Sequence, residues 1–265
     1  LAAVIASDGR AGVAYVDITT GEFLTTELES SDLSSAIRSE LMRLQPAEIL
    51  MPDNLELANG FPGHITRIPA WKFETGRCQE VILRHFSAGS LDGFGLRGKP
   101  MAARSAGAIL QYLQDNQKGS LKLLTSLATY TLDDFMTLDA ATRRNLELTE
   151  TIRQGETQGS LLSVLDHTVT PMGKRQIRQW VSKPLLNLET IRARQASVGQ
   201  LLENGMLRTE LRAAMRPLGD LERLTARVIS GSALPRDLIM LRSTLSALPA
   251  ILSILTHSAG ALEDL

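Results

Sequence analysis

The first half of the chain alternates short runs of apolar and β-branched residues with turn residues. Three such runs, each typical of a strand, cover residues 2–6, 12–18 and 22–28. Asp8-Gly9 and Thr20-Gly21 separate them, and connections this short favour antiparallel neighbours because a parallel crossover needs a dozen or more residues. The pattern therefore predicts a meander of three strands.

An amphipathic helix follows the third run. Leu33, Ile37, Leu41 and Leu44 recur at helical spacing, and Pro46 ends the pattern. The other elements expected in this half are a strand over 47–51, helices over about 74–86 and from Pro100 onward, and a glycine-rich loop over 87–98 between those helices. The order β-β-β-α-β-α-α predicts an α/β domain with a mixed sheet, a pattern also found in RNase H-like folds.

Beyond Asp139, glycine becomes sparse and the spacing of apolar residues turns almost wholly helical. Asn187 is a suitable N-cap for a helix that runs through Leu202. The leucines over 234–255 then alternate steps of four and three, which is the heptad seam of a long helix, although Pro249 within it should cause a kink. The second half is therefore expected to be an all-α domain.

This leucine seam has two interpretations. In an ordinary amphipathic helix, the leucines would face the core of their own domain. In a helical pair, they would need a partner of matching length, roughly 32 Å at 1.5 Å per residue, and too few residues follow to supply one. On that second interpretation we expect the part before Pro249 to pack on residues 221–228. The part beyond it should fray, or pair with another molecule that covers Leu252 and Leu255.

Composition describes an ordinary soluble globular chain, with 43% hydrophobic, 22% charged and only 4% aromatic residues among 265. The length favours two domains, and Lys118-Gly119-Ser120 interrupts the pattern near their boundary, so we assign residues 1–123 and 124–265. No apolar run approaches the roughly 20 residues of a membrane span. The chain also begins with Leu rather than Met. We therefore expect a cytoplasmic section of a longer protein, without membrane contact.

Net charge and cysteine content limit the kinds of binding and catalytic site that this chain could contain. The formal net charge of −1 lacks the basic excess typical of proteins that neutralise phosphates, so any DNA affinity of this chain alone should be weak. The single cysteine, Cys78, excludes an internal disulfide, and four scattered histidines lack the spacing of a zinc site. Since no GxSxG elbow is present either, the sequence does not indicate nucleophilic catalysis.

Residues 93–99, GFGLRGK, fit both the GxGxxG template of dinucleotide sites and the GxxxxGK template of P-loops. Both templates require an apolar strand before the first glycine, whereas the polar stretch 87–92 precedes it here. Pro100 stands where a P-loop needs Ser or Thr for magnesium, and it has no N–H for phosphate. We therefore expect residues 93–99 to be a loop between two helices. The alternative interpretation is a nucleotide-binding module, whose affinity for ATP would be lost on Lys99→Ala.

A two-metal nuclease is the main alternative function. The expected fold would place five carboxylates around one sheet, namely Asp8, Asp17, Glu22, Glu40 and Asp53. Hydrolysis needs several carboxylates that converge on ions about 4 Å apart. Acidic residues are equally common in turns and at strand ends, so the pattern alone does not establish a metal site.

Four motifs of the second half are far more distinctive. They are, in order, MTLDAATRRNLEL (136–148), SVLDHTVTPMGKR (163–175), GDLERL (219–224) and PRDL (235–238). These motifs and their spacing closely resemble the core domain of the MutS family of DNA mismatch repair proteins. The first half resembles the connector domain of the same family, notably in DITTGEF (17–23) and DGFG (92–95).

Most motif residues have structural roles on physical grounds. Asp139 can cap the helix that carries Arg144, and Thr170 can cap the next helix. Gly173 permits close helix approach, and Trp180 supplies a large buried anchor. The polar groups that could instead lie at a domain interface are Arg143, Asn145 and Lys174.

The resemblance implies a division of labour. Family members read mismatches with an N-terminal domain bearing Phe-x-Glu, and their ATPase, which uses ATP and Mg²⁺, lies at the C-terminal end. A clamp is inserted between their lever helices. This chain shows neither the Phe-x-Glu motif nor a true Walker A sequence. It should therefore be the middle section, which connects the mismatch reader to the core and relays the ATPase state to the DNA clamp.

Sites and partners follow from the same resemblance. No catalytic, cofactor-binding or metal residue is expected in this chain, and the family's connector resembles RNase H without acting as a nuclease. The implied partners are MutL, through the connector, mismatched DNA, through the complete protein, and a second MutS subunit. Fold alone would not establish these functions.

Overall fold

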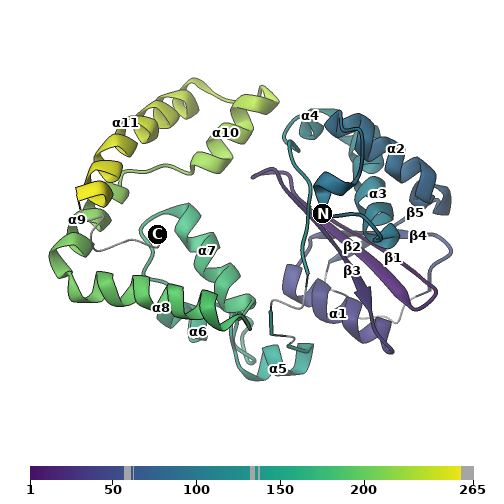
Figure 1. Cartoon of the computed structure of the whole chain (residues 1–265), viewed down its shortest axis with the longest axis horizontal. Coiled ribbons are helices and arrows are strands. Elements are labelled where there is room, and N and C mark those ends of the chain that lie inside the picture. Colours follow the sequence, from purple (N-terminus) through teal and green to yellow (C-terminus); the bar gives the residue numbers. More distant parts are fainter. Residues whose placement is uncertain (57–60, 62, 132–134, 137, 258–265) are drawn as a thin grey trace. The chain divides into compact units, whose positions relative to one another are not determined.

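The computed structural model describes residues 1–56, 61, 63–131, 135–136 and 138–257 (Figure 1). Its backbone contacts divide the chain into two compact units. The first comprises Leu1–Leu132 with Leu138–Ala140, and the second comprises Asp133–Thr137 with Ala141–Leu265. An α/β unit is followed by a helical one, which confirms the predicted fold class.

A six-stranded mixed sheet forms the centre of the first unit. Its strands are β1 (Ala2–Ser7), β2 (Arg10–Asp17), β3 (Glu22–Glu29), β4 (Glu48–Pro52), β5 (His64–Ile68) and β6 (Ala128–Thr129). They lie in the order β5-β4-β1-β2-β3-β6. The first three pair antiparallel, as predicted from their short turns, and the other neighbours pair parallel.

The two outer strands, β5 and β6, are missing from the sequence-based prediction. The β5 segment reads HITRI, and only its last residue is buried. Its sequence therefore lacks the alternation of a half-buried strand. The β6 segment has two residues, which is too short for any periodic signal. β5 pairs with β4, the preceding strand, whereas β6 depends on pairing with β3, which lies far away in sequence.

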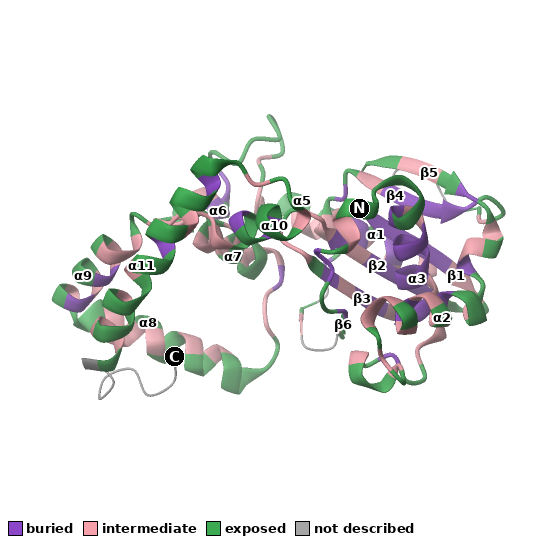
Figure 2. Ribbon diagram, turned by 90° about the horizontal axis from the view of Figure 1, so that it is seen from above, coloured by how far each residue is buried: buried purple, intermediate pink, exposed green. Residues whose placement is uncertain are grey.

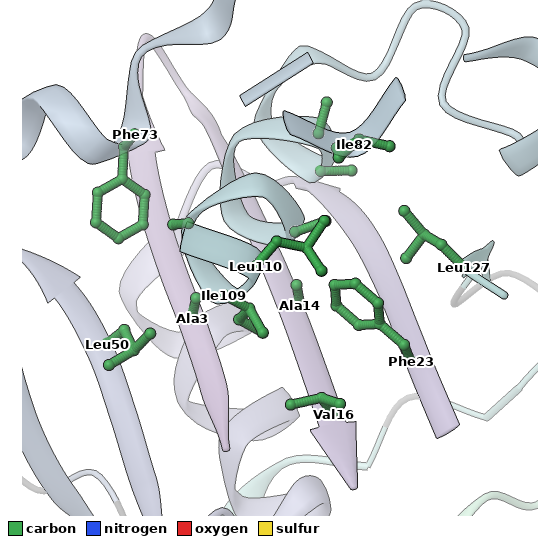
Figure 3. Packing of buried hydrophobic residues seen from close by; sticks show 14 of the residues in the cluster. Ala3, Ala14, Val16, Phe23, Leu50, Phe73, Ile82, Ile109, Leu110 and Leu127 are labelled. Carbon is green, nitrogen blue, oxygen red and sulfur yellow. The ribbon is translucent and has the colours of Figure 1, made fainter. Parts of the chain in front are cut away.

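Helices cover both faces of the sheet. The helical segments of this unit are α1 (Leu33–Leu44), the 3₁₀ helices η1 (Ala70–Phe73) and η2 (Asp92–Phe94), α2 (Thr75–Phe86), α3 (Pro100–Asn116) and α4 (Lys118–Leu121). Successive residues of a strand point to opposite faces. Ala3 therefore packs in a cluster with Ile82 of α2 and Ile109 of α3 (Figure 3), whereas Val4 packs with Ile37 of α1.

The helix α3 lies directly between β2 and α2. A Cβ atom at Gly12 of β2 would lie 1.9 Å from the carbonyl oxygen of Met101. A Cβ atom at Gly107 of α3 would lie 2.4 Å from that of Cys78 in α2. Both positions therefore require glycine, since the backbones approach too closely for any side chain.

The second unit is built from helices of moderate length. They are α5 (Ala140–Asn145), α6 (Leu161–Leu165), α7 (Pro171–Ser182), α8 (Leu188–Glu203), α9 (Gly205–Met215), α10 (Leu221–Ser230) and α11 (Pro235–His257). The side chains of Thr170, Asn187, Asn204 and Asp220 cap α7 to α10, each accepting the backbone N–H three residues ahead. The caps predicted at Thr170 and Asn187 are confirmed.

Two predictions about the α7 motif are wrong. Trp180 is 39% exposed rather than buried, and its ring lies 4.0 Å from the guanidinium carbon of Arg194. No residue of α7 is buried, so the helix offers no core for the indole to anchor. At Gly173, an added Cβ would meet Thr170 and Thr168, so the glycine accommodates its own N-terminal cap rather than a neighbouring helix.

Burial differs sharply between the units (Figure 2). Strands β1, β2 and β4 and most of α3 are buried, whereas the helices of the second unit show mainly exposed and intermediate positions. The apolar cluster of the second unit contains Leu207 and Leu211 of α9, with Ile251, Ile254 and Leu255 of α11 against them. Such thin burial leaves much apolar helix surface available for other contacts.

Candidate functional site

The glycine-rich loop before α3 is not free to hold a phosphate. The backbone N–H groups of Met101 and Ala102 both donate to Oε2 of Glu27, at 2.7 and 3.3 Å. The Glu27 side chain is only 5% exposed. A helix N-terminus attracts anions through its unpaired N–H groups, and here a carboxylate from β3 already occupies them. The expected interhelix loop is confirmed, since residues 93–99 connect α2 to α3.

The five carboxylates of the nuclease alternative have separate local partners. Asp8 accepts from Ser7, Asp17 from Thr19, Glu22 from Tyr15, Glu40 from Arg43, and Asp53 from the backbone of Ala70. Within the part of the chain that the structure describes, no three His, Cys, Asp or Glu side chains gather as a metal-binding group. This arrangement gives the nuclease alternative no support.

Cys78 also has a structural environment. Its thiol lies within hydrogen-bonding distance of the carbonyl oxygens of Lys72 and Arg104, at 3.2 and 3.4 Å. Burial raises the pKa of this thiol to about 12, so it stays protonated and is a poor nucleophile near neutral pH.

A cavity of about 330 Å³ opens beside η1 and α2, and Trp71 lines it. Trp71 is 49% exposed, yet the Arg77 guanidinium carbon lies 4.4 Å from its ring centroid. Arg77 is held by a 2.7 Å hydrogen bond from its Nε to Gln111, which in turn donates to the Lys72 carbonyl at 2.7 Å. The cation therefore has a fixed position over the ring, and Glu80 on the rim is paired with Arg84.

A buried ionic cluster joins α1 to the segment after β6. Nε of Arg43 donates to Glu40 at 2.8 Å, and the Tyr130 hydroxyl also donates to Glu40. The Glu40 and Arg43 side chains are 3% and 7% exposed. Burial, strengthened by the nearby Glu40 charge, raises the pKa of Tyr130 well above its usual value, so the hydroxyl remains a donor. We call Tyr130, Glu40 and Arg43 the Tyr130 cluster.

In the second unit, an ion pair connects α7 to the start of α10. Arg175 binds Asp220 through two parallel hydrogen bonds of 2.6 and 2.8 Å, and also contacts Glu222. Asp220 simultaneously caps α10. The hydrogen bonds from Arg175 lower the pKa of the Asp220 carboxyl. This bidentate geometry is the strong form of an Arg–carboxylate contact.

The three proposed interface residues have different surroundings. Arg143 donates to the carbonyl of Ser182 at 2.7 Å, which ties α5 to the end of α7. Asn145 and Lys174 are exposed. Arg143 thus has a structural contact within its own unit, and the other two remain candidates for an interface.

Most of the leucine seam of α11 faces away from its own unit, although Leu255 packs against Leu207 and Leu211. Leu234, Leu238, Leu245, Leu248 and Leu252 are between 38% and 62% exposed, the lowest being Leu248 and the highest Leu252. The described residues therefore leave this stripe uncovered. The interpretation that the leucines face their own core is wrong for these five residues.

The opposite face of α11 makes the contacts within the unit. Thr244 is buried and accepts from the Gly219 N–H at 3.0 Å, and Ile251 and Ile254 pack on Leu211 of α9. Of the two outcomes predicted for the part beyond Pro249, fraying is wrong, because the helix continues to His257 and packs on α9. Leu255 is covered within its own unit, whereas Leu252 stays exposed. The sequence-based expectation missed this second apolar face.

The apolar character of α11 also corrects the statement that no run approaches a membrane span. Residues Pro235–Thr256 are long and apolar enough to cross a bilayer, with a mean hydropathy of 1.8. Length and composition alone are weak grounds for a span, and this helix packs on α9 and α10.

Comparison with known proteins identifies both units. Residues 1–125 match the family model for MutS domain II, and residues 141–265 match the model for MutS domain III. The DNA mismatch repair protein MutS of Trichodesmium erythraeum (strain IMS101) is 42% identical over 267 residues, which cover 95% of this chain and 29% of that protein. The DNA mismatch repair protein MutS of Nostoc punctiforme is 43% identical over 277 residues, covering 97% of this chain and 30% of that protein.

A more distant relative gives the same result. The DNA mismatch repair protein MutS of Roseiflexus castenholzii is 37% identical over 308 residues, covering all of this chain and 28% of that protein. The chain thus spans less than a third of the length of these relatives. With two models of one family covering most of its length, the chain belongs to the MutS family and carries that family's domains II and III.

Proposed function

We propose that this chain is the connecting and lever section of a DNA mismatch repair protein. The first unit would join a mismatch-reading domain to the core, and α11 would be one lever that relays the ATPase state to a DNA clamp. ATP, Mg²⁺ and the mismatch would be bound elsewhere in the complete protein, so this section would have no catalytic activity of its own. The complete protein would act in the cytoplasm on mismatched DNA, together with a second subunit.

The uncovered seam of α11 carries this proposal. A helix of 23 residues rises roughly 35 Å at 1.5 Å per residue, and its leucine stripe is exposed at Leu238, Leu245, Leu248 and Leu252. An exposed apolar stripe of this kind marks a contact surface. A second long helix from the remainder of the protein would fit a heptad seam, and such a pair could transmit a displacement along its axis.

Substitution on the seam tests the lever role. In a complete MutS protein carrying this section, Leu238→Glu with Leu245→Glu should abolish ATP-dependent release of mismatched DNA while ATP hydrolysis continues. The matched control is Ser243→Glu with Ser246→Glu, at exposed polar positions on the same helix. Equal behaviour of the two double variants would contradict the lever role.

For MutL we propose docking on the first unit at the Trp71 cavity. Exposed Trp and Arg residues are the usual anchors of a protein interface, and both lie at this rim. Trp71→Ala should abolish capture of the chain by MutL, whereas Trp180→Ala, which removes the exposed tryptophan of the second unit, should not. Full capture of the Trp71→Ala chain would exclude this surface.

DNA binding by the isolated chain should be weak. Its formal net charge of −1 gives little attraction to phosphates, and the affinity that remains should depend on ion pairs with phosphates and therefore fall with added salt. Selective binding of a mismatch by this chain, measured by fluorescence anisotropy against a matched duplex, would contradict the proposal that another domain reads the mismatch.

A further inference from the structure

The charged side chains that line the Trp71 cavity are paired with one another, except for one. The cations are Lys72, Arg77 and Arg84, and the anions are Glu80 and Asp115. Lys72 binds Asp115, and Arg84 binds Glu80 one turn away on α2. Within the part of the chain that the structure describes, no carboxylate forms an ion pair with Arg77. The lining of the cavity therefore carries one positive charge that is not neutralised.

Arg77 is nevertheless held in one place. Its Nε donates to Gln111 at 2.7 Å, and its guanidinium carbon lies 4.4 Å from the ring centroid of Trp71. Gln111 is only 5% exposed, and its amide nitrogen donates to the carbonyls of Lys72 and Gly107 at 2.7 and 3.3 Å. Backbone groups thus fix the acceptor of Arg77. A ligand that binds this cation does not have to order a flexible side chain, which favours its affinity.

The contacts of Arg77 leave its two terminal nitrogens available. Among the described residues, its side chain makes a hydrogen bond only through Nε, and the residue is exposed. Nη1 and Nη2 present parallel N–H groups that match the two oxygens of a carboxylate. Trp71 is 49% exposed, so its indole offers apolar surface to the carbon atoms of the same ligand.

A single unpaired charge suits a carboxylate better than a phosphate. A phosphoryl group carries about −1.5 to −2 charges at neutral pH and is usually bound by several basic residues together. Here Lys72 and Arg84 are engaged with acids of their own, so their recruitment would break two ion pairs. The backbone of DNA would require still more free cations.

We propose that Arg77 is the anchor for an acidic side chain of the protein that docks at the Trp71 cavity. The carboxylate accepts from Nη1 and Nη2 of Arg77, and Trp71 packs against the same side chain. This inference rests on the proposal that MutL docks here, and it adds the chemistry by which the surface recognises its partner. A neutral or basic residue at that position of the partner would leave Arg77 unpaired within the interface, which gives specificity.

The test compares Arg77→Gln with Arg97→Gln in the whole chain. Each substitution removes one positive charge from an exposed arginine, but Arg97 lies in the loop before α3 and does not line the cavity. In biolayer interferometry, the affinity for MutL should fall roughly tenfold or more in Arg77→Gln, because a charged hydrogen bond is lost. It should stay within about twofold in Arg97→Gln. Arg77→Lys, which keeps the charge but loses the paired N–H groups, should give an intermediate affinity.

Charge reversal identifies the acidic residue of the partner. Arg77→Glu should abolish capture by MutL. In a set of MutL variants, each with one surface Asp or Glu replaced by Lys, one variant should restore capture of the Arg77→Glu chain. Restoration by none of them, or equal losses in Arg77→Gln and Arg97→Gln, would overturn the proposal. An Arg77→Gln chain that keeps its affinity for MutL but loses affinity for duplex DNA would also overturn it, since phosphate would then be the ligand.

Trp71→Ala separates this inference from the docking proposal on which it rests. Full capture of both the Trp71→Ala and the Arg77→Gln chains would show that MutL docks elsewhere, and both proposals would fail. Loss of capture in Trp71→Ala, with full affinity in Arg77→Gln, would contradict only the carboxylate contact. Circular dichroism should show the same melting temperature for Arg77→Gln and Arg97→Gln, because both side chains are exposed.

Discussion

Removal of the Glu27 carboxylate should destabilise the first unit more than the loss of one hydrogen-bonding side chain usually does. Glu27 reaches from β3 to the N-terminus of α3, where Oε2 accepts from two backbone N–H groups. Its side chain is 5% exposed, so water cannot readily replace it. In Glu27→Ala, two N–H groups at the start of the central helix lose their acceptor.

The magnitude follows from the two bonds. Hydrogen bonds to a charged group contribute roughly 1.5–3 kcal/mol each, and their strengths are not additive, so Glu27→Ala should cost about 2–4 kcal/mol. Glu27→Gln keeps an acceptor oxygen but loses the charge that faces the helix dipole, which costs about 1 kcal/mol. Arg10 is 48% exposed and 3.7 Å from Glu27, so Arg10→Ala should cost less than about 1 kcal/mol.

The assay must report on the first unit alone. The chain has two tryptophans, Trp71 in the first unit and Trp180 in the second. In a Trp180→Phe background, urea unfolding followed by the fluorescence of Trp71 therefore measures the first unit. The expected order of stability loss is Glu27→Ala, then Glu27→Gln, then Arg10→Ala. A loss in Glu27→Ala no larger than that in Arg10→Ala would refute the reasoning.

Three further predictions concern other contacts. Gly107→Ala should destabilise the first unit by about 1–3 kcal/mol in urea unfolding, because the added Cβ would lie 2.4 Å from that of Cys78, whereas Gly119→Ala, in open space, should not. Cys78 should react with a thiol reagent only after unfolding, because burial raises its pKa to about 12. Arg175 lowers the pKa of Asp220 in the folded chain. Their pairing therefore stabilises the second unit fully when the pH is above the unfolded-state pKa of about 3.9, and this stabilisation is lost as the pH falls through the lower pKa of the folded state. Asp220→Asn, which keeps the cap, should therefore lower the melting temperature at pH 7 and flatten its decline in acid.

Local signals explain which parts of the fold could be predicted. The meander of β1 to β3 follows from two short turns, and the caps Thr170 and Asn187 act within their own first helical turn. The contact of Glu27 with Met101 spans 74 positions, and no local pattern signals it. The same limit applies to β6, whose pairing depends on a distant edge of the sheet.

The candidate site was less predictable than the fold. Aromatic residues favour burial, yet both Trp71 and Trp180 are exposed beside a guanidinium group. Which side of a tryptophan faces solvent depends on tertiary packing that periodicity cannot encode. On α11, the leucine period was correct, but a second apolar stripe through Ile251 and Ile254 makes the internal contacts.

The close approach of α3 to its neighbours has a mechanical consequence. At Gly12 and Gly107, backbone meets backbone or Cβ without an intervening side chain, and between them α3 presents a run of small residues, Ala102, Ala103, Ala106 and Ala108, all buried. Long side chains can change rotamer and absorb a displacement, but methyl groups and bare backbone cannot. The sheet, α3 and α2 should therefore move together as one rigid body that deforms little. A force applied at one edge of this unit would turn the whole body instead of bending it.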